Sequence, residues 1–240
     1  MVGKSQIKLI KSLQLKKNRN LHQLFVVEGL KTIQELLKSS FEVYSVFSTD
    51  DHFVEENSAF SALISSVDLK KMSSLNTPNG YLGVFKMSQK KAIHDNAWVV
   101  AVDTIQDPGN LGTIIRLCDW FGIKDLVCSS DTVDCYNPKV IQATMGSITR
   151  VNVTYLNLID FLEETGLPIY GAFMDGETVY TSQMPVKGIL VMGNEANGVS
   201  AEVEKLVQKR ISIPQFGAQT AESLNVATAT AILLNEIRRG

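Results

Sequence analysis

Beyond residue 96 the chain alternates short apolar runs with amphipathic stretches. Residues 97–102 form a continuous apolar run, which is typical of a strand buried on both faces of a sheet. Further strand-like runs lie at residues 126–128, 151–155, 169–173, 189–192 and 211–213. Strands that alternate with helices in this way predict a parallel sheet covered by helices, and so an α/β domain.

The clearest helical periodicity lies in residues 110–121. Leu111, Ile114, Ile115 and Cys118 recur at the spacing of one helix face. Asn110 is suited to the N-cap of this helix and Gly122 to its C-terminal stop. Other helices are expected to open at residues 137–138, near 158 and near 200, and a last helix to span about 223–239.

Residues 22–90 have a different texture. Strands are expected at 22–27, 43–47 and 80–85, and helical segments at 30–37 and 65–75. Residues 87–96 are polar and lack periodicity, so they read as a linker. The chain is therefore predicted to contain a small α/β domain over residues 1–90 and a second, parallel-sheet domain over residues 97–240.

Composition narrows the class of protein. With 45% hydrophobic and 20% charged residues, the 240-residue chain is expected to fold. No apolar run reaches the ~20 residues of a membrane helix, and the N-terminus lacks the features of a secretory signal. Three cysteines without CxxC spacing argue against a disulfide framework or a zinc site. These observations predict a cytoplasmic protein without membrane contact.

Charge is unevenly distributed. The whole chain has a net charge of −2, yet residues 1–40 hold eight Lys or Arg against two Glu, a net charge of +6. Such a segment can neutralise phosphates of a polyanion and so suggests a nucleic-acid partner. The alternative is an ordinary solvated helix end.

Three segments rich in Asn and Gly are candidates for chemistry. They are residues 107–112, 193–198 and 213–225. Each lies in the loop that comes after an expected strand. Ligands of parallel α/β sheets bind beyond the carboxyl ends of strands, where such loops would meet. Each segment could instead be a plain turn or helix cap. Arg116 lies off the apolar stripe of its helix, so a solvated arginine is the simpler reading.

Several known sites are excluded. The chain contains neither a P-loop nor a GxGxxG fingerprint, and no serine lies in a GxSxG elbow. His22, His52 and His94 have no second histidine or cysteine at ligand spacing, so no metal site is expected.

Taken together, the three segments resemble motifs 1, 2 and 3 of the SpoU (TrmH) family of S-adenosylmethionine-dependent RNA ribose 2′-O-methyltransferases. The matching residues are 107–116 (DPGNLGTIIR), 190–198 (LVMGNEANG), and 211–214 (ISIP) with 222–227 (ESLNVA). Residues 25–31 (FVVEGLK) also resemble the N-terminal substrate-binding domain of the ribosomal-RNA members. Two positions depart from the family pattern: Gln142 stands where arginine is common and Gln215 where methionine is common.

The resemblance implies more than local patterns do. It implies a deep trefoil knot in the C-terminal domain and a homodimer formed through that domain, with Ala227, Ala229 and Ala231 permitting close packing. The donor S-adenosylmethionine would be held by backbone groups of Gly193, Ile213 and Leu224. The catalytic set carried over from the motifs is Asn110, Arg116, Glu195, Ser223 and Asn225.

The expected function is methylation of a ribose 2′-hydroxyl in RNA, with ribosomal RNA preferred because of the additional N-terminal domain. Transfer RNA is the alternative substrate, and a non-catalytic RNA-binding protein and a dinucleotide-dependent oxidoreductase are the rival classes. We expect Arg116 to bind the RNA phosphate beside the target and polarise the hydroxyl, because a guanidinium is essentially always protonated.

Overall fold

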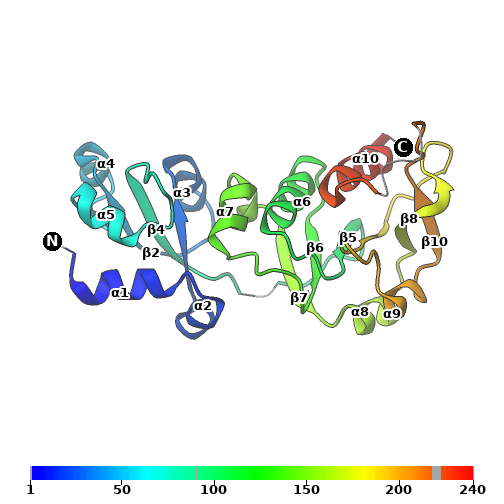
Figure 1. The fold of residues 1–240 in the computed structure, drawn as a ribbon, viewed down its shortest axis with the longest axis horizontal. Coiled ribbons are helices and arrows are strands. Elements are labelled where there is room, and N and C mark those ends of the chain that lie inside the picture. Colours follow the sequence, from blue (N-terminus) through cyan, green and yellow to red (C-terminus); the bar gives the residue numbers. More distant parts are fainter. Residues whose placement is uncertain (1, 90, 218–222, 240) are drawn as a thin grey trace. The chain divides into compact units, whose positions relative to one another are not determined.

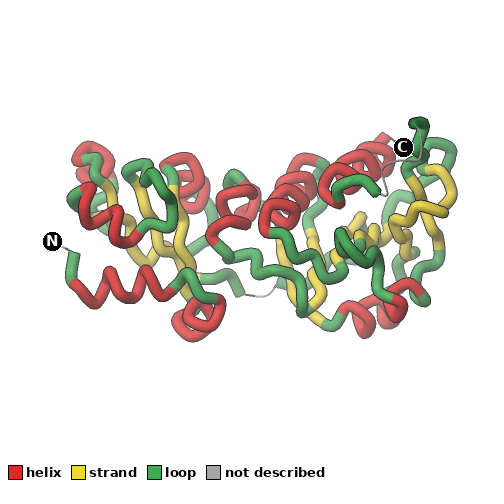
Figure 2. Tube along the Cα trace, viewed as in Figure 1, coloured by secondary structure: helices red, strands yellow, loops and turns green. Residues whose placement is uncertain are grey.

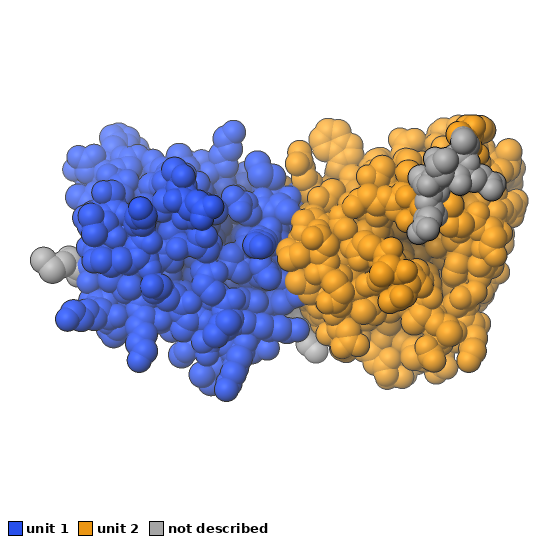
Figure 3. All heavy atoms as spheres, viewed as in Figure 1, with its two compact units in different colours: residues 1–89, 134–149 blue, residues 90–133, 150–240 orange. Residues whose placement is uncertain are grey.

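The computed structural model describes residues 2–89, 91–217 and 223–239 (Figure 1). Figure 3 shows how the chain divides into two compact units. Unit 1 contains residues 1–89 and 134–149, and unit 2 contains residues 90–133 and 150–240. Among the described residues, no helix combines the length and apolar character that crossing a membrane requires.

Unit 2 is built on a parallel sheet, as the sequence predicts. Its six described strands lie in the order β10-β8-β9-β5-β6-β7, and every ladder between them is parallel. The strands are β5 (Trp98–Val102), β6 (Asp125–Ser129), β7 (Asn152–Leu156), β8 (Ile169–Thr178), β9 (Gly188–Met192) and β10 (Lys209–Ser212). All residues of β5, β6 and β9 are buried, which explains their unbroken apolar runs. The trefoil knot stays a prediction.

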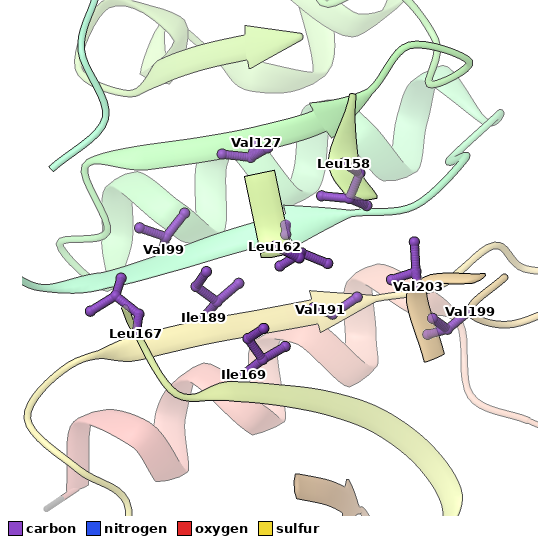
Figure 4. Packing of buried hydrophobic residues seen from close by; sticks show 11 residues of the cluster. Val99, Val127, Leu158, Leu162, Leu167, Ile169, Ile189, Val191, Val199 and Val203 are labelled. Carbon is purple, nitrogen blue, oxygen red and sulfur yellow. The ribbon is translucent and has the colours of Figure 1, made fainter. Parts of the chain in front are cut away.

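Helices cover both faces of this sheet (Figures 1 and 2). On one face α6 (Pro108–Trp120) packs beside α10 (Val226–Arg239), and on the other α8 (Leu158–Glu164) packs beside α9 (Ala201–Glu204). Figure 4 shows the core on the α8 side, where Leu158 and Leu162 meet valines and isoleucines of the sheet. Removing this apolar surface from water, at about 25 cal/mol per Å², is the main stabilising term of the unit.

The start of α6 differs from the prediction. The N-cap is Asp107, not Asn110, and its Oδ1 accepts the backbone N–H of Asn110 at 2.8 Å. Proline at the first helical position needs no N–H partner, so the helix can begin at Pro108. Gly122 (φ 66°) follows the last turn in the left-handed conformation, as predicted. The early cap leaves the Asn110 side chain available for other contacts.

Unit 1 is a small α/β unit, also as predicted. Its sheet has the order β1-β4-β2-β3, with β3 parallel to β2 and the other pairs antiparallel. The strands are β1 (Leu24–Glu28), β2 (Val43–Ser48), β3 (Ser61–Leu63) and β4 (Tyr81–Lys86). The helices are α1 (Lys4–Ser12), α2 (Lys16–His22), α3 (Leu30–Leu37), α4 (Asp51–Glu56), α5 (Ser66–Met72) and α7 (Pro138–Thr144), with a 3₁₀ turn at Ser147–Thr149.

The basic N-terminal segment is part of this fold. Ile10 and Leu13 are buried against the sheet, so α1 is packed on one face, while its lysines stay exposed. Arg19 is also buried: its Nε donates to Asp134 Oδ2 at 2.9 Å, and its Nη1 donates to the carbonyls of Leu13 and Gln14. Arg19 is therefore a structural residue, and the positive charge left on the surface of this segment comes from lysines.

Residues 134–149 belong with unit 1 although they follow β6 in the chain. Helix α7 packs on β1, and the ring centroids of Tyr136 and Phe25 lie 4.6 Å apart. The domains predicted from sequence, residues 1–90 and 97–240, are each one continuous segment. The two compact units, in contrast, are each built from two separate segments. Whether residues 1–90 and 97–240 act as separate functional domains stays a prediction.

Candidate functional site

Three loops of unit 2 leave the sheet at the carboxyl ends of β5, β9 and β10, as predicted. The loops after β9 and β10, together with β8 and α10, line a pocket of about 470 Å³. Its lining includes the three residues predicted to hold a donor: Gly193, Ile213 and Leu224. The carboxylate-bearing Glu195 lies at the same pocket, and so does Ser223.

Other residues that line the pocket were not predicted from the sequence. Phe173 and Met174 of β8 line it, as do Met192 at the end of β9 and Leu233 of α10. Phe173 lies within the expected strand, but no local pattern indicated that it faces a pocket, and Met174 lies beyond the expected end of that strand at residue 173. The lining is largely apolar, with polar groups confined to the loops.

A chain of side-chain hydrogen bonds joins one residue from each motif. Asn110 Nδ2 donates to Glu195 Oε1 at 2.7 Å, and Asn225 Nδ2 donates to Asn110 Oδ1 at 2.9 Å. These residues are 85 and 115 positions apart in sequence, so only the folded sheet edge brings them together. Three of the five predicted catalytic residues therefore form one network.

The network is anchored at the start of α10. Asn225 Oδ1 accepts the backbone N–H groups of Ala227 (3.0 Å) and Thr228 (3.2 Å), so Asn225 caps that helix. The helix begins at Val226 and not at residue 223 as expected. Because its oxygen is used for capping, the Asn225 side chain must turn its NH₂ group to Asn110. That orientation in turn leaves the Asn110 NH₂ group for Glu195.

Gly193 lies where the chain leaves no room for a side chain. A Cβ at this position would lie 2.2 Å from the Gly198 carbonyl carbon and 2.3 Å from the Val199 nitrogen. The loop folds back tightly here, with Asn194 and Gly198 exchanging two backbone hydrogen bonds of 2.8 and 2.9 Å. Glycine is thus required by the loop itself, whether or not a ligand approaches.

Arg116 lies apart from this network. It is exposed on α6, two turns beyond Asn110, and it makes no hydrogen bond or ion pair within the described part of the chain. With a rise of 1.5 Å per residue, its Cα lies about 9 Å along the helix axis from that of Asn110. The structure therefore leaves the guanidinium available to solvent, and Arg116 is not among the residues that line the pocket.

One wall of the pocket is held by Arg210 of β10. Its guanidinium carbon lies 3.7 Å from the centroid of the Phe173 ring, and its nitrogens donate to Asp175 and Glu204. The hydrogen bond from Arg210 is the main cause that lowers the pKa of Asp175 below its ordinary value. Arginine stacked on an aromatic face in this way restricts the Phe173 ring.

Among the described residues, no three His, Cys, Asp or Glu side chains gather closely enough to bind a metal ion. The site is thus made of amides, one carboxylate, glycine-rich backbone and an apolar pocket.

The chain is similar to known proteins over nearly its whole length. The SpoU rRNA Methylase family matches residues 97–235, and the MRM3-like substrate binding domain matches residues 4–83. The 23S rRNA (guanosine(2553)-2′-O)-methyltransferase RlmP of Bacillus subtilis is 31% identical, over 97% of this chain and 96% of that protein.

Two solved structures share the architecture. A TrmH-family protein from Porphyromonas gingivalis has a TM-score of 0.90 at 36% identity, covering 100% of this chain and 99% of that one. An AdoMet-bound rRNA methyltransferase from Sinorhizobium meliloti has a TM-score of 0.89 at 27% identity, covering 100% and 97% of the two chains. With both domains matched in order and the three motif loops assembled at one sheet edge, this chain belongs to the SpoU rRNA methylase family.

Proposed function

We propose that this protein transfers the methyl group of S-adenosylmethionine to a ribose 2′-hydroxyl of ribosomal RNA. The observation that carries the proposal is the Asn110–Glu195–Asn225 network, whose Glu195 also lines the pocket proposed for the donor. The similarity to RlmP, a 23S rRNA 2′-O-methyltransferase, supports the choice of substrate. Transfer RNA remains the alternative.

The pocket fits the proposed donor. Its volume of about 470 Å³ lies within the range of roughly 300–1,000 Å³ found for small-molecule sites. Apolar walls from Ile213, Leu224 and Phe173 suit a planar base, and the loop backbone around Gly193 offers hydrogen-bonding groups. When bound there, S-adenosylmethionine supplies an electrophilic methyl group on a sulfonium.

The protein's own residues then orient the ribose and handle its proton. Exposed Arg116 binds the adjacent phosphate and polarises the 2′-hydroxyl, while the Glu195 carboxylate, fixed by Asn110, orients the nucleotide. The hydroxyl proton passes to phosphate or water, since a guanidinium is already protonated. Positioning of this kind supplies several kcal/mol of the barrier, on the order of 7 or more in favourable cases.

Unit 1 is proposed to bind RNA away from the reacting nucleotide. Residues 4–83 match a substrate-binding domain, and α1 exposes lysines without any acidic residue in the helix. We further propose that the protein acts in the cytoplasm, in keeping with a ribosomal-RNA substrate. The catalytic groups all belong to unit 2, so the two functions are divided between the units.

A homodimer through the exposed faces of α6 and α10 completes the proposal. Trp120 is 83% exposed on the same α6 stripe as Thr113 and Arg116. Of the alanines expected to permit packing, Ala227 is buried within the unit, whereas Ala231 is partly exposed. A second copy would cover Trp120. Sedimentation should show a dimer for the wild type and a monomer for Trp120→Glu; a wild-type monomer would contradict the proposal.

The direct test maps 2′-O-methyl groups on total RNA from cells with and without the gene. Loss of one ribosomal methyl group, restored by the wild type and not by Glu195→Ala, is the expected result. Loss from transfer RNA would replace the substrate, and an unchanged methylation map would favour a binding protein. For the oxidoreductase reading, NAD and not S-adenosylmethionine would raise the melting temperature.

A further inference from the structure

The loop that carries Glu195 is tied to a strained residue at the end of β5. Thr104 has φ 60°, one of three non-glycine residues with positive φ among the described residues. For a β-branched side chain the left-handed conformation is a true outlier, and such conformations persist only where the surroundings enforce them.

Every polar group of Thr104 has a partner. Its N–H donates to Ser129 Oγ at 2.8 Å, and its hydroxyl donates to Asp103 Oδ1 at 3.0 Å. Its carbonyl accepts a hydrogen bond of 2.6 Å from Asn194 Nδ2. The left-handed turn thus directs the Thr104 carbonyl to the loop after β9, away from the ladder of β5.

The Asn194 side chain connects the Thr104 carbonyl to the backbone of the loop after β9. Its side-chain Oδ1 accepts the backbone N–H groups of Ala196 (2.8 Å) and Asn197 (3.3 Å), the two residues that follow Glu195. The far end of the loop is held as well, because Asp103 Oδ2 accepts the N–H of Ser200 at 2.8 Å. Asp103 itself is buried and its carboxylate is satisfied by these bonds.

We propose that Thr104 and Asn194 are a positioning pair that sets Glu195 for its hydrogen bond with Asn110. Asn194 also lines the pocket, but its side-chain amide is engaged with Thr104 and with the backbone of residues 196–197, so the pair acts through the backbone of residues 194–197. This inference rests on the proposed function of Glu195. The left-handed backbone at Thr104 presents its carbonyl to the Asn194 amide.

The central test uses Asn194→Asp, which keeps the acceptor for Ala196 and Asn197 but loses the donor to Thr104. We expect amides of residues 195–199 to exchange with solvent at least about tenfold faster in the ligand-free protein, while β5 and β9 exchange as in the wild type. We also expect kcat to fall at least tenfold with KM for RNA changed less than threefold. Asn197→Ala, whose side chain lies outside the network, is the matched control and should match the wild type.

A double mutant tests whether the pair works through Glu195. If it does, Asn194→Asp combined with Glu195→Ala should be no slower than Glu195→Ala alone. Thr104→Gly makes the left-handed conformation only one of several that the backbone can adopt, so amides of residues 195–199 should again exchange faster than in the wild type.

Two results would overturn the inference: wild-type exchange of the loop in Asn194→Asp, or additive losses in the double mutant. The exchange experiment needs no substrate, so it decides the matter even if the wild type methylates no RNA. If the wild type methylates no RNA, the proposed function fails, but the exchange rates of the loop amides still show whether Thr104 and Asn194 position the loop.

Discussion

At the scale of single residues, the site depends on which group caps which helix. Asp107 caps α6 and so frees the Asn110 side chain, whereas Asn225 caps α10 with its oxygen and contacts Asn110 with its nitrogen. Both asparagine amides therefore have a fixed orientation. Sequence alone assigned the cap of α6 to Asn110, because local preference cannot distinguish neighbouring candidates at a helix start.

This double use of Asn225 leads to a prediction. Asn225→Asp keeps the capping oxygen and should leave the free energy of unfolding nearly unchanged, whereas Asn225→Ala should lower it by about 1 kcal/mol. Both variants lose the bond to Asn110, so both should be between about tenfold and a hundredfold slower in methyl transfer. Thermal melts and single-turnover rates check the two effects. A fast Asn225→Asp would show that Asn110 needs no fixed orientation.

A second prediction concerns Gly193. A methyl group there collides with the backbone of Gly198 and Val199, so Gly193→Ala should distort the loop and destabilise the protein by about 1–3 kcal/mol. S-adenosylmethionine should then no longer raise the melting temperature. Gly166→Ala is the control, since a Cβ at Gly166 meets nothing within 4 Å. A normal ligand-induced shift in Gly193→Ala would contradict the placement of the donor pocket.

At the scale of elements, α2 is joined to residues 134–149 by one buried ion pair. Arg19 and Asp134 lie in the same unit, 115 positions apart, with side chains 2% and 9% exposed. Arg19→Met would leave a buried carboxylate without its cation and should cost about 3–5 kcal/mol. Hydrogen exchange of β1 and β4 amides measures this loss within unit 1.

The matched double variant separates charge from packing. Arg19→Met with Asp134→Asn removes both charges and keeps an acceptor for the Tyr136 N–H, so part of the loss should be recovered. Equal losses in the single and double variants would mean that shape, not charge, is what Arg19 contributes.

Elements with a strong local pattern were predictable. The segment expected to be helical at 30–37 is α3, and the apolar run at 97–102 contains β5. Elements set by distant partners were not. β3 has only three residues and exists because it pairs with β2, and β8 continues to Thr178 because its outer part meets β10 after a shift of register. The burial of Arg19 likewise depends on Asp134, a residue that no local pattern connects to it.

At the scale of the whole molecule, the three motifs correctly indicated which loops come together. The linear sequence did not indicate which residues belong to each compact unit. The three motif loops meet at one sheet edge because parallel strands all end there. Residues 134–149, by contrast, lie between two strands of unit 2 and pack in unit 1. A cut at residue 97 would therefore separate α7 from β1 and expose its buried Val140 and Ile141.

The last prediction concerns RNA affinity. Lys4, Lys8 and Lys11 recur at i, i+4 and i+7 on α1, all exposed, and span about 10 Å of helix. Arg19 is buried and cannot contribute, so deleting residues 1–20 would confuse lost charge with lost folding. Changing the three lysines to glutamine removes charge alone.

If each lysine contacts one phosphate, the slope of log affinity against log salt should fall in magnitude by about 2 for single-stranded RNA. The affinity lost should shrink as salt rises, while S-adenosylmethionine binding and the rate at saturating RNA stay near wild type, because the proposed donor pocket belongs to unit 2. Glutamine at Lys139, Lys187 and Lys205, equally exposed and equal in charge, is the control and should change the slope far less. Equal slopes in the two triple variants would mean that RNA affinity depends only on the net charge of the protein. The α1 lysines would then form no specific contact surface.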